Sequence, residues 1–116
     1  MPEKNKAIYY KEIDIKTAGK LKSLLLLFDR ALVLLKQAKE SPEKRNAIIV
    51  QTQNILAQLE QSLDFNRGGL AGDLFFVFDF LFEDLQRRDE RAVDTALKMI
   101  SGLRGAFAAL SRKPRD

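Results

Sequence analysis

The sequence has no cysteine, no histidine and no tryptophan in its 116 residues. Without cysteine and histidine it lacks thiol nucleophiles, disulfides, zinc-finger ligands and the usual general base at neutral pH. We therefore expect no catalytic residue, no metal site and no cofactor, and predict that the chain is not an enzyme. The lack of cysteine also fits a reducing compartment, so we expect a cytoplasmic protein.

Long apolar runs are missing as well. The stretch Leu24 to Phe28 stops at Asp29, far short of the roughly 20 residues that span a bilayer. Residues 1–10 lack the apolar stretch of a secretory signal. No membrane span is expected.

The net charge of +4 is unevenly distributed, because the bases gather at the two ends of the chain. This leaves the middle slightly acidic, and the basic ends have no aromatic residues interleaved as in phosphate-binding grooves. Residues 111–116 are interpreted as a basic, solubilising tail that can touch an acidic partner. Nucleic acid is not an expected partner.

Proline occurs only at positions 2, 42 and 114, which leaves two long stretches free to form helices. Apolar residues at three- and four-residue spacing predict helices over 17–40, 42–62, 70–88 and 90–110. Ser41 with Pro42 and then Asp89 read as helix starts, and residues 64–69 read as a turn. A strand over 74–82 is the alternative, but its length and flanking charges favour a helix.

Together these features predict a single-domain, all-α protein, an antiparallel four-helix bundle over residues 1–116. Residues 1–16 are expected to form an N-terminal arm, or a short extra helix, that lies across the bundle. The residues expected to face the core are Leu24, Phe28, Ala31, Leu35, Ala38, Ile48, Thr52, Ile55, Leu59, Leu63, Leu74, Phe78, Leu81, Leu85, Val93, Ala96, Ile100, Leu103 and Phe107.

The helices carry more apolar surface than one core can use. At 100° per residue, Phe76 and Phe80 point away from the core face of their helix, among carboxylates. The same geometry turns Leu26 and Val33 outward on the first helix and Val50 and Ala57 outward on the second. A covering arm, an additional helix or a second copy of the chain explains this pattern as well as a partner polypeptide does.

Four stretches of the chain resemble the flagellar export chaperones, which hold flagellin in the bacterial cytoplasm. The matching residues are Tyr10 with Ile15, Thr17 and Ala18; Leu27-Phe28 with Ala31-Leu32 and Ala38; Gln53 to Leu56 with Leu59, Ser62 to Phe65 and Gly68 to Ala71; and Phe78 to Phe80 with Leu103-Arg104 and Ala106-Phe107. The chain departs from the family pattern at Gly19-Lys20, where Ser-Pro is common, and at Phe107, where the family has tryptophan.

The resemblance implies a helical chaperone that binds the disordered C-terminal segment of flagellin, prevents its premature polymerisation and assists its export. It places Tyr10, Ile15, Thr17 and Ala18 near the client, and components of the type III export apparatus become further possible partners. Leu26, Val33, Val50, Ala57, Phe76 and Phe80 are candidates from helical geometry alone, and Phe78 is expected in the core. The alternative is a self-associating helical adaptor of the flagellar system that forms a homodimer.

Overall fold

The computed structural model describes residues 3–64 and 69–112, with side chains described from residue 21 to residue 110. These residues form four α-helices, α1 (Glu3–Glu40), α2 (Arg45–Gln61), α3 (Gly69–Asp84) and α4 (Glu90–Arg112). Two single 3₁₀ turns, η1 (Pro42–Lys44) and η3 (Leu85–Arg87), stand before α2 and after α3. The all-α four-helix prediction is confirmed, and residues 74–82 are helical.

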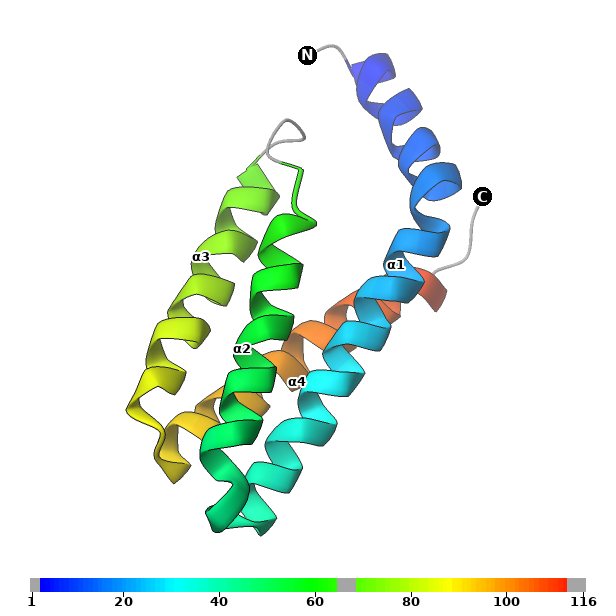
Figure 1. Ribbon diagram of the computed structural model, residues 1–116. Coiled ribbons are helices and arrows are strands. Elements are labelled where there is room, and N and C mark those ends of the chain that lie inside the picture. Colours follow the sequence, from blue (N-terminus) through cyan, green and yellow to red (C-terminus); the bar gives the residue numbers. More distant parts are fainter. Residues whose placement is uncertain (1–2, 65–68, 113–116) are drawn as a thin grey trace.

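Helices α1, α2 and α3 lie side by side in that order, each antiparallel to the next (Figure 1). Helix α4 crosses the far side of this three-helix layer and packs most closely on α1. Small residues on the two helices, Ala31 and Ala38 of α1 and Ala92 and Ala96 of α4, are fully buried. Their size lets the two helix axes approach closely.

When the 3₁₀ turns η1 and η3 are counted with α2 and α3, the predicted helix ends are correct to within two residues, with the exception of the start of the first helix. As α-helices, α2 starts at Arg45 rather than residue 42 and α3 ends at Asp84 rather than residue 88. The first helix begins at Glu3 rather than near Thr17, so residues 3–16 continue α1 instead of lying across the bundle. Figure 1 shows these first turns projecting away from α2 and α3. Residues 3–16 contain neither proline nor glycine. Gly19 follows them, and one glycine costs a helix only about 1 kcal/mol.

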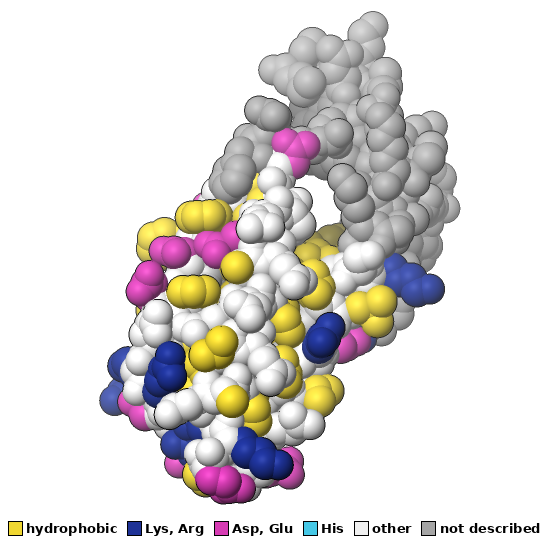
Figure 2. All heavy atoms as spheres, viewed as in Figure 1, with side chains coloured by type: hydrophobic (Ala, Val, Ile, Leu, Met, Phe, Trp, Pro, Cys, Tyr) yellow, Lys and Arg dark blue, Asp and Glu magenta, His cyan; other side chains and the backbone are white. Residues whose placement is uncertain are grey.

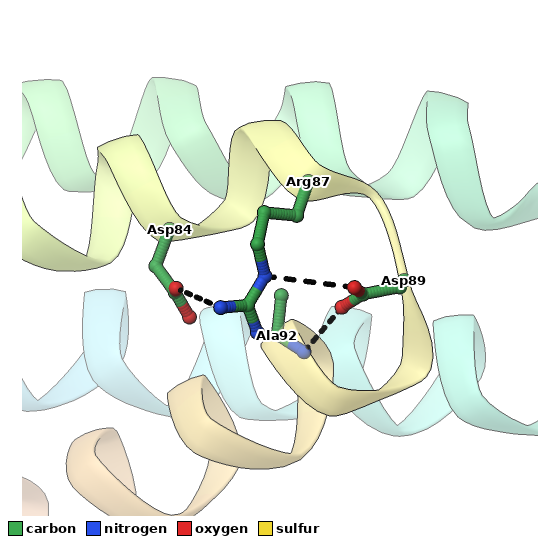
Figure 3. A network of polar contacts seen from close by, with 4 residues as sticks. All are labelled: Asp84, Arg87, Asp89 and Ala92. Atoms are coloured by element: carbon green, nitrogen blue, oxygen red, sulfur yellow. Dashed lines mark hydrogen bonds and ion pairs between the residues drawn. The ribbon is translucent and has the colours of Figure 1, made fainter.

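The corner between α3 and α4 is built from polar contacts (Figure 3). Asp89 Oδ1 accepts a hydrogen bond of 2.8 Å from the backbone N–H of Ala92, which confirms the predicted cap of α4. Arg87 bridges Asp84 at 3.0 Å and Asp89 at 3.5 Å. Arg88 adopts the left-handed conformation, with φ 57°, that ends η3 and turns the chain.

The core is centred on Phe28 of α1. Its ring lies 6.2 Å from the ring of Phe78 on α3 and 5.8 Å from that of Phe107 on α4. The inward stripes predicted from the sequence are confirmed, since each of their residues is buried or packs against this core.

Two polar side chains are buried on α2. Thr52 donates to the carbonyl of Ile48 in its own helix, at 3.0 Å. Gln53 reaches across to α3, where its Nε2 donates to the carbonyl of Phe82 at 3.0 Å. Phe82 lies in the last turn of α3, where carbonyls lack a helical donor, so Gln53 caps α3 from a neighbouring helix.

Within the described ranges, none of the helices is both long and apolar enough to cross a membrane.

Candidate partner-binding surface

Among the side chains that the structure describes, the most exposed aromatic ones lie on the outer side of α3. Phe76 is 74% exposed and Phe80 is 45% exposed, while Phe78 between them is 1% exposed in the core. This confirms the outward positions predicted for Phe76 and Phe80 and the core position of Phe78. Phe75 is 40% exposed beside them. We call Phe75, Phe76 and Phe80 the aromatic ridge.

Carboxylates border the aromatic ridge. Asp73, Asp79 and Glu83 are exposed on the same helix, and acidic and hydrophobic side chains alternate along this edge of the molecule in Figure 2. Across the gap to α2, partial burial and then the charge of Asp79 raise the pKa of Glu60. The ridge therefore lies in a negative electrostatic environment.

The outward residues predicted on the other two helices have mixed outcomes. Leu26 and Val33 on α1 and Val50 on α2 are exposed, as predicted. Ala57 is half-buried, which corrects its predicted exposure. Ala57 points partly toward α3. A helical wheel of α2 alone does not show where α3 packs.

A shallow hollow of about 290 Å³ lies between α1 and α2. Its apolar lining comes from Leu34 and Ile55, and its polar lining comes from Arg30, Gln51, Asn54 and Gln58. The hollow offers hydrogen-bonding amides and one guanidinium around a small apolar floor. None of the side chains that line the hollow is a nucleophile or a proton-transfer group.

One broad face of the protein is the side of the three-helix layer that points away from α4 (Figure 1). Figure 2 shows hydrophobic side chains spread over all three helices on this face. We call it the layer face. Leu26, Val33, Val50, Phe76 and Phe80 are exposed on the three helices that form this layer.

The positions chosen from the family pattern near the N-terminus, Tyr10, Ile15, Thr17 and Ala18, belong to α1 by their backbone. Their side chains lie outside the described part of the structure, so their role as binding residues stays a prediction.

Sequence reasoning missed three exposed apolar residues, Leu70, Phe75 and Leu110. Phe75 sits at the edge of the predicted core stripe, where exposure depends on how far α2 covers it. Leu70 and Leu110 lie near helix ends, where a periodic stripe no longer touches a neighbour. A helical wheel shows in which direction a side chain points from its own helix, but it does not show how far the neighbouring helix covers that side chain.

The comparison with known families gives one match. The model of the family described as flagellar protein FliS matches residues 3–114, nearly the whole chain. No curated protein and no solved structure matches.

Proposed function

Since the chain belongs to the flagellar protein FliS family, a family of flagellin export chaperones rather than of enzymes, we propose that its client is the disordered C-terminal segment of flagellin. The protein binds this segment in the bacterial cytoplasm and keeps it from polymerising too early. It then assists delivery to the type III flagellar export apparatus.

The observation that carries this proposal is the aromatic ridge. Fully burying one phenylalanine contributes roughly 1.5 to 3 kcal/mol, yet Phe76 remains 74% exposed. Several such residues on adjacent helices exceed what a monomer ordinarily leaves in water. A disordered segment that folds as an amphipathic helix buries this kind of surface as it binds.

The proposed client surface consists of the aromatic ridge, with Leu26, Val33, Val50 and the edge of Ala57. The family pattern adds Tyr10, Ile15, Thr17 and Ala18 near the client. Because α1 is continuous from Glu3, its N-terminal turns do not cover the layer face, and the client meets that face directly.

Isothermal titration calorimetry with a synthetic peptide of the C-terminal 40 or so residues of flagellin from the same bacterium tests the proposal. We expect one peptide per chain at micromolar affinity or better. The double variant Phe76→Ser/Phe80→Ser should weaken binding by about tenfold or more, since buried aromatic anchors dominate such interfaces. Leu110→Ser, which changes an apolar residue of intermediate exposure on α4 (58%, between Phe80 and Phe76), is the control. Absence of binding heat at micromolar concentrations refutes the proposal.

A further inference from the structure

The hollow between α1 and α2 has the chemistry of an anion site. Of the residues that line it, only Arg30 carries a charge, and the other polar groups are the side-chain amides of Gln51, Asn54 and Gln58. A guanidinium and an amide nitrogen both donate hydrogen bonds. None of the lining residues is a carboxylate that could accept these bonds. The hollow therefore favours a ligand with negative charge.

These donors have no partner inside the protein. In the part of the chain whose side chains the structure describes, no hydrogen bond or ion pair engages the four polar side chains of the hollow. Asp29, the carboxylate next to Arg30 in the sequence, is held by Arg104 of α4 at 2.8 Å. The facing stretch of α2 does not neutralise Arg30 either, because residues 46–59 carry no charge. The guanidinium is therefore available to a ligand.

The hollow spans about two turns of helix. On α2 its lining runs from Gln51 to Gln58, a rise of about 10 Å, and on α1 it runs from Arg30 to Leu34, a rise of about 6 Å. Its volume of about 290 Å³ lies at the lower end of pockets that take drug-sized molecules, roughly 300 Å³. Leu34 and Ile55 form its apolar floor. This space suits one apolar residue with an attached acidic group.

The single positive charge matches a carboxylate. A guanidinium binds the two oxygens of a carboxylate through two parallel N–H donors. An ionised carboxylate accepts about four hydrogen bonds, so about two positions remain for amide donors after it pairs with Arg30. The three amides follow one another at three- and four-residue spacing on one side of α2. A phosphate monoester carries close to two negative charges at pH 7, which exceeds the one positive charge of the hollow.

The hollow borders three exposed apolar residues of the candidate surface. On α1, Leu26 lies four residues before Arg30 and Val33 lies three residues after it, which places all three on one side of the helix. On α2, Val50 lies four residues before Asn54. A polypeptide that covers these apolar side chains therefore passes the rim of the hollow.

From this arrangement we propose that the hollow binds the C-terminal carboxylate of the flagellin segment. The site rests on the proposed chaperone function, because that client ends in a free carboxylate. Arg30 pairs with the two oxygens, the amides of α2 donate to the remaining lone pairs, and the last side chain of the client lies on Leu34 and Ile55.

This contact gives the client a fixed register. An amphipathic segment that shifts by one helical turn still buries apolar side chains, so apolar contacts alone select a register weakly. A chain end occurs once in each client. Pairing of its carboxylate with Arg30 therefore selects one register along α1 and α2.

Isothermal titration calorimetry with two synthetic peptides tests the site. Both carry the C-terminal sequence of flagellin from the same bacterium, one with its natural free carboxylate and the other with a C-terminal amide. The amide removes the negative charge and keeps every apolar side chain. We expect the wild type to bind the amidated peptide about tenfold or more weakly, because the charge-assisted pair with Arg30 is lost.

A variant of Arg30 locates this preference in the hollow. Arg30→Gln should weaken binding of the free-carboxylate peptide by about tenfold and should reduce its preference over the amide to about twofold or less, since the two changes remove the same contact. Lys36→Gln is the matched control, because Lys36 is an exposed base on the same helix outside the hollow, and it should keep the preference. A preference that persists in Arg30→Gln, or that is lost in both variants, overturns the assignment.

The side-chain amide signals in nuclear magnetic resonance spectra give a second, local measurement. The NH₂ signals of Gln51, Asn54 and Gln58 should differ between the complexes with the free and the amidated peptide. The NH₂ signal of Asn46, an exposed amide on α2 outside the hollow, should be the same in both. Equal differences at Asn46 and at the hollow, or no difference at the hollow, overturn the placement of the carboxylate.

The same titrations separate this inference from the proposed function. Equal binding of both peptides to the wild type overturns the carboxylate site and leaves the chaperone function standing. Equal binding of both peptides together with a loss in Arg30→Gln shows that the hollow takes an acidic side chain inside the client, which also overturns the terminal contact. Failure of both peptides to bind overturns the proposed function and the carboxylate site together.

Discussion

Replacing Gln53 by methionine should detach the end of α3 from α2. The side chain of Gln53 is 6% exposed, and its single cross-helix hydrogen bond, 3.0 Å to the carbonyl of Phe82, bridges 29 residues of sequence. Methionine has a similar length and volume, so the core keeps its packing while the donor is lost. The change therefore isolates the hydrogen bond from the cavity effects of a smaller residue.

The magnitude follows from the place of Phe82 in α3. Asp84 is the last residue of α3 and a 3₁₀ turn follows, so the carbonyl of Phe82 has no α-helical donor to replace Gln53. The net contribution of a hydrogen bond is about 1 kcal/mol, and a buried carbonyl left without a donor costs about 1 to 3 kcal/mol. This site is only partly buried, so we expect a loss of about 2 kcal/mol, or about thirtyfold in the folding equilibrium.

Urea unfolding followed by circular dichroism measures the loss. Gln51→Met is the matched control, because Gln51 is an exposed amide on the same helix and surface changes of this kind remain within about 0.5 kcal/mol. Hydrogen exchange should also accelerate at residues 85–87 in the Gln53 variant alone. If the free energies of unfolding of the two variants agree within about 0.5 kcal/mol, the capping role assigned to Gln53 is wrong.

Three further predictions concern single sites. Burial and then the charge of Asp79 raise the pKa of Glu60 above its ordinary 4.5, so ionised Glu60 destabilises the fold. Glu60→Gln should therefore be more stable than wild type at pH 7 in urea unfolding. This difference in stability should vanish below pH 4.5, where Glu60 is protonated in both the folded and the unfolded chain. A Cβ at Gly102 meets nothing within 4 Å, so Gly102→Ala should stabilise α4 by about 1 kcal/mol in the same assay. Asp89→Ala should cost about 1 kcal/mol in thermal unfolding through loss of the cap on Ala92.

Each of these has a contrary result. A constant difference between Glu60→Gln and wild type across pH would show that the carboxyl does not titrate differently on folding. Destabilisation by Gly102→Ala would mean that α4 needs a close backbone approach at this position. For the cap, Asp89→Asn keeps an accepting oxygen and should remain within a few tenths of a kcal/mol of wild type; an equal loss in both variants would assign the effect to the ion pair with Arg87 instead.

Much of the fold follows from residue spacing, because burial on a helix repeats with the helix. The stripe through Phe28, Ala31 and Leu35 and the cap at Asp89 are local signals, and both are confirmed. The start of α1 is not set by such a signal. Nothing in residues 3–16 breaks a helix, and an amphipathic pattern cannot distinguish a helix that continues from one that folds back.

For the candidate surface, the sequence predicts which side chains point outward, but not how much of each side chain is exposed. Phe76 lies opposite Phe78 on any wheel of α3, whatever its neighbours are. The partial burial of Ala57 and the partial exposure of Phe75 depend on how α2 and α3 sit against each other. Gln53 shows the same limit, since the sequence identifies a buried amide but not the carbonyl 29 residues away that it serves.

The unbroken length of α1 has a mechanical meaning. From Glu3 to Phe28 the helix rises about 37 Å, and most of that length extends past α2 and α3 (Figure 1). Phe28 sits at the base of this rod, in ring contact with both Phe78 and Phe107. A force applied sideways to the first turns of α1 is therefore transmitted along the helix to Phe28 and to its ring contacts with α3 and α4. A partner that binds the N-terminal turns of α1 can therefore change the packing around Phe28 without contacting the layer face.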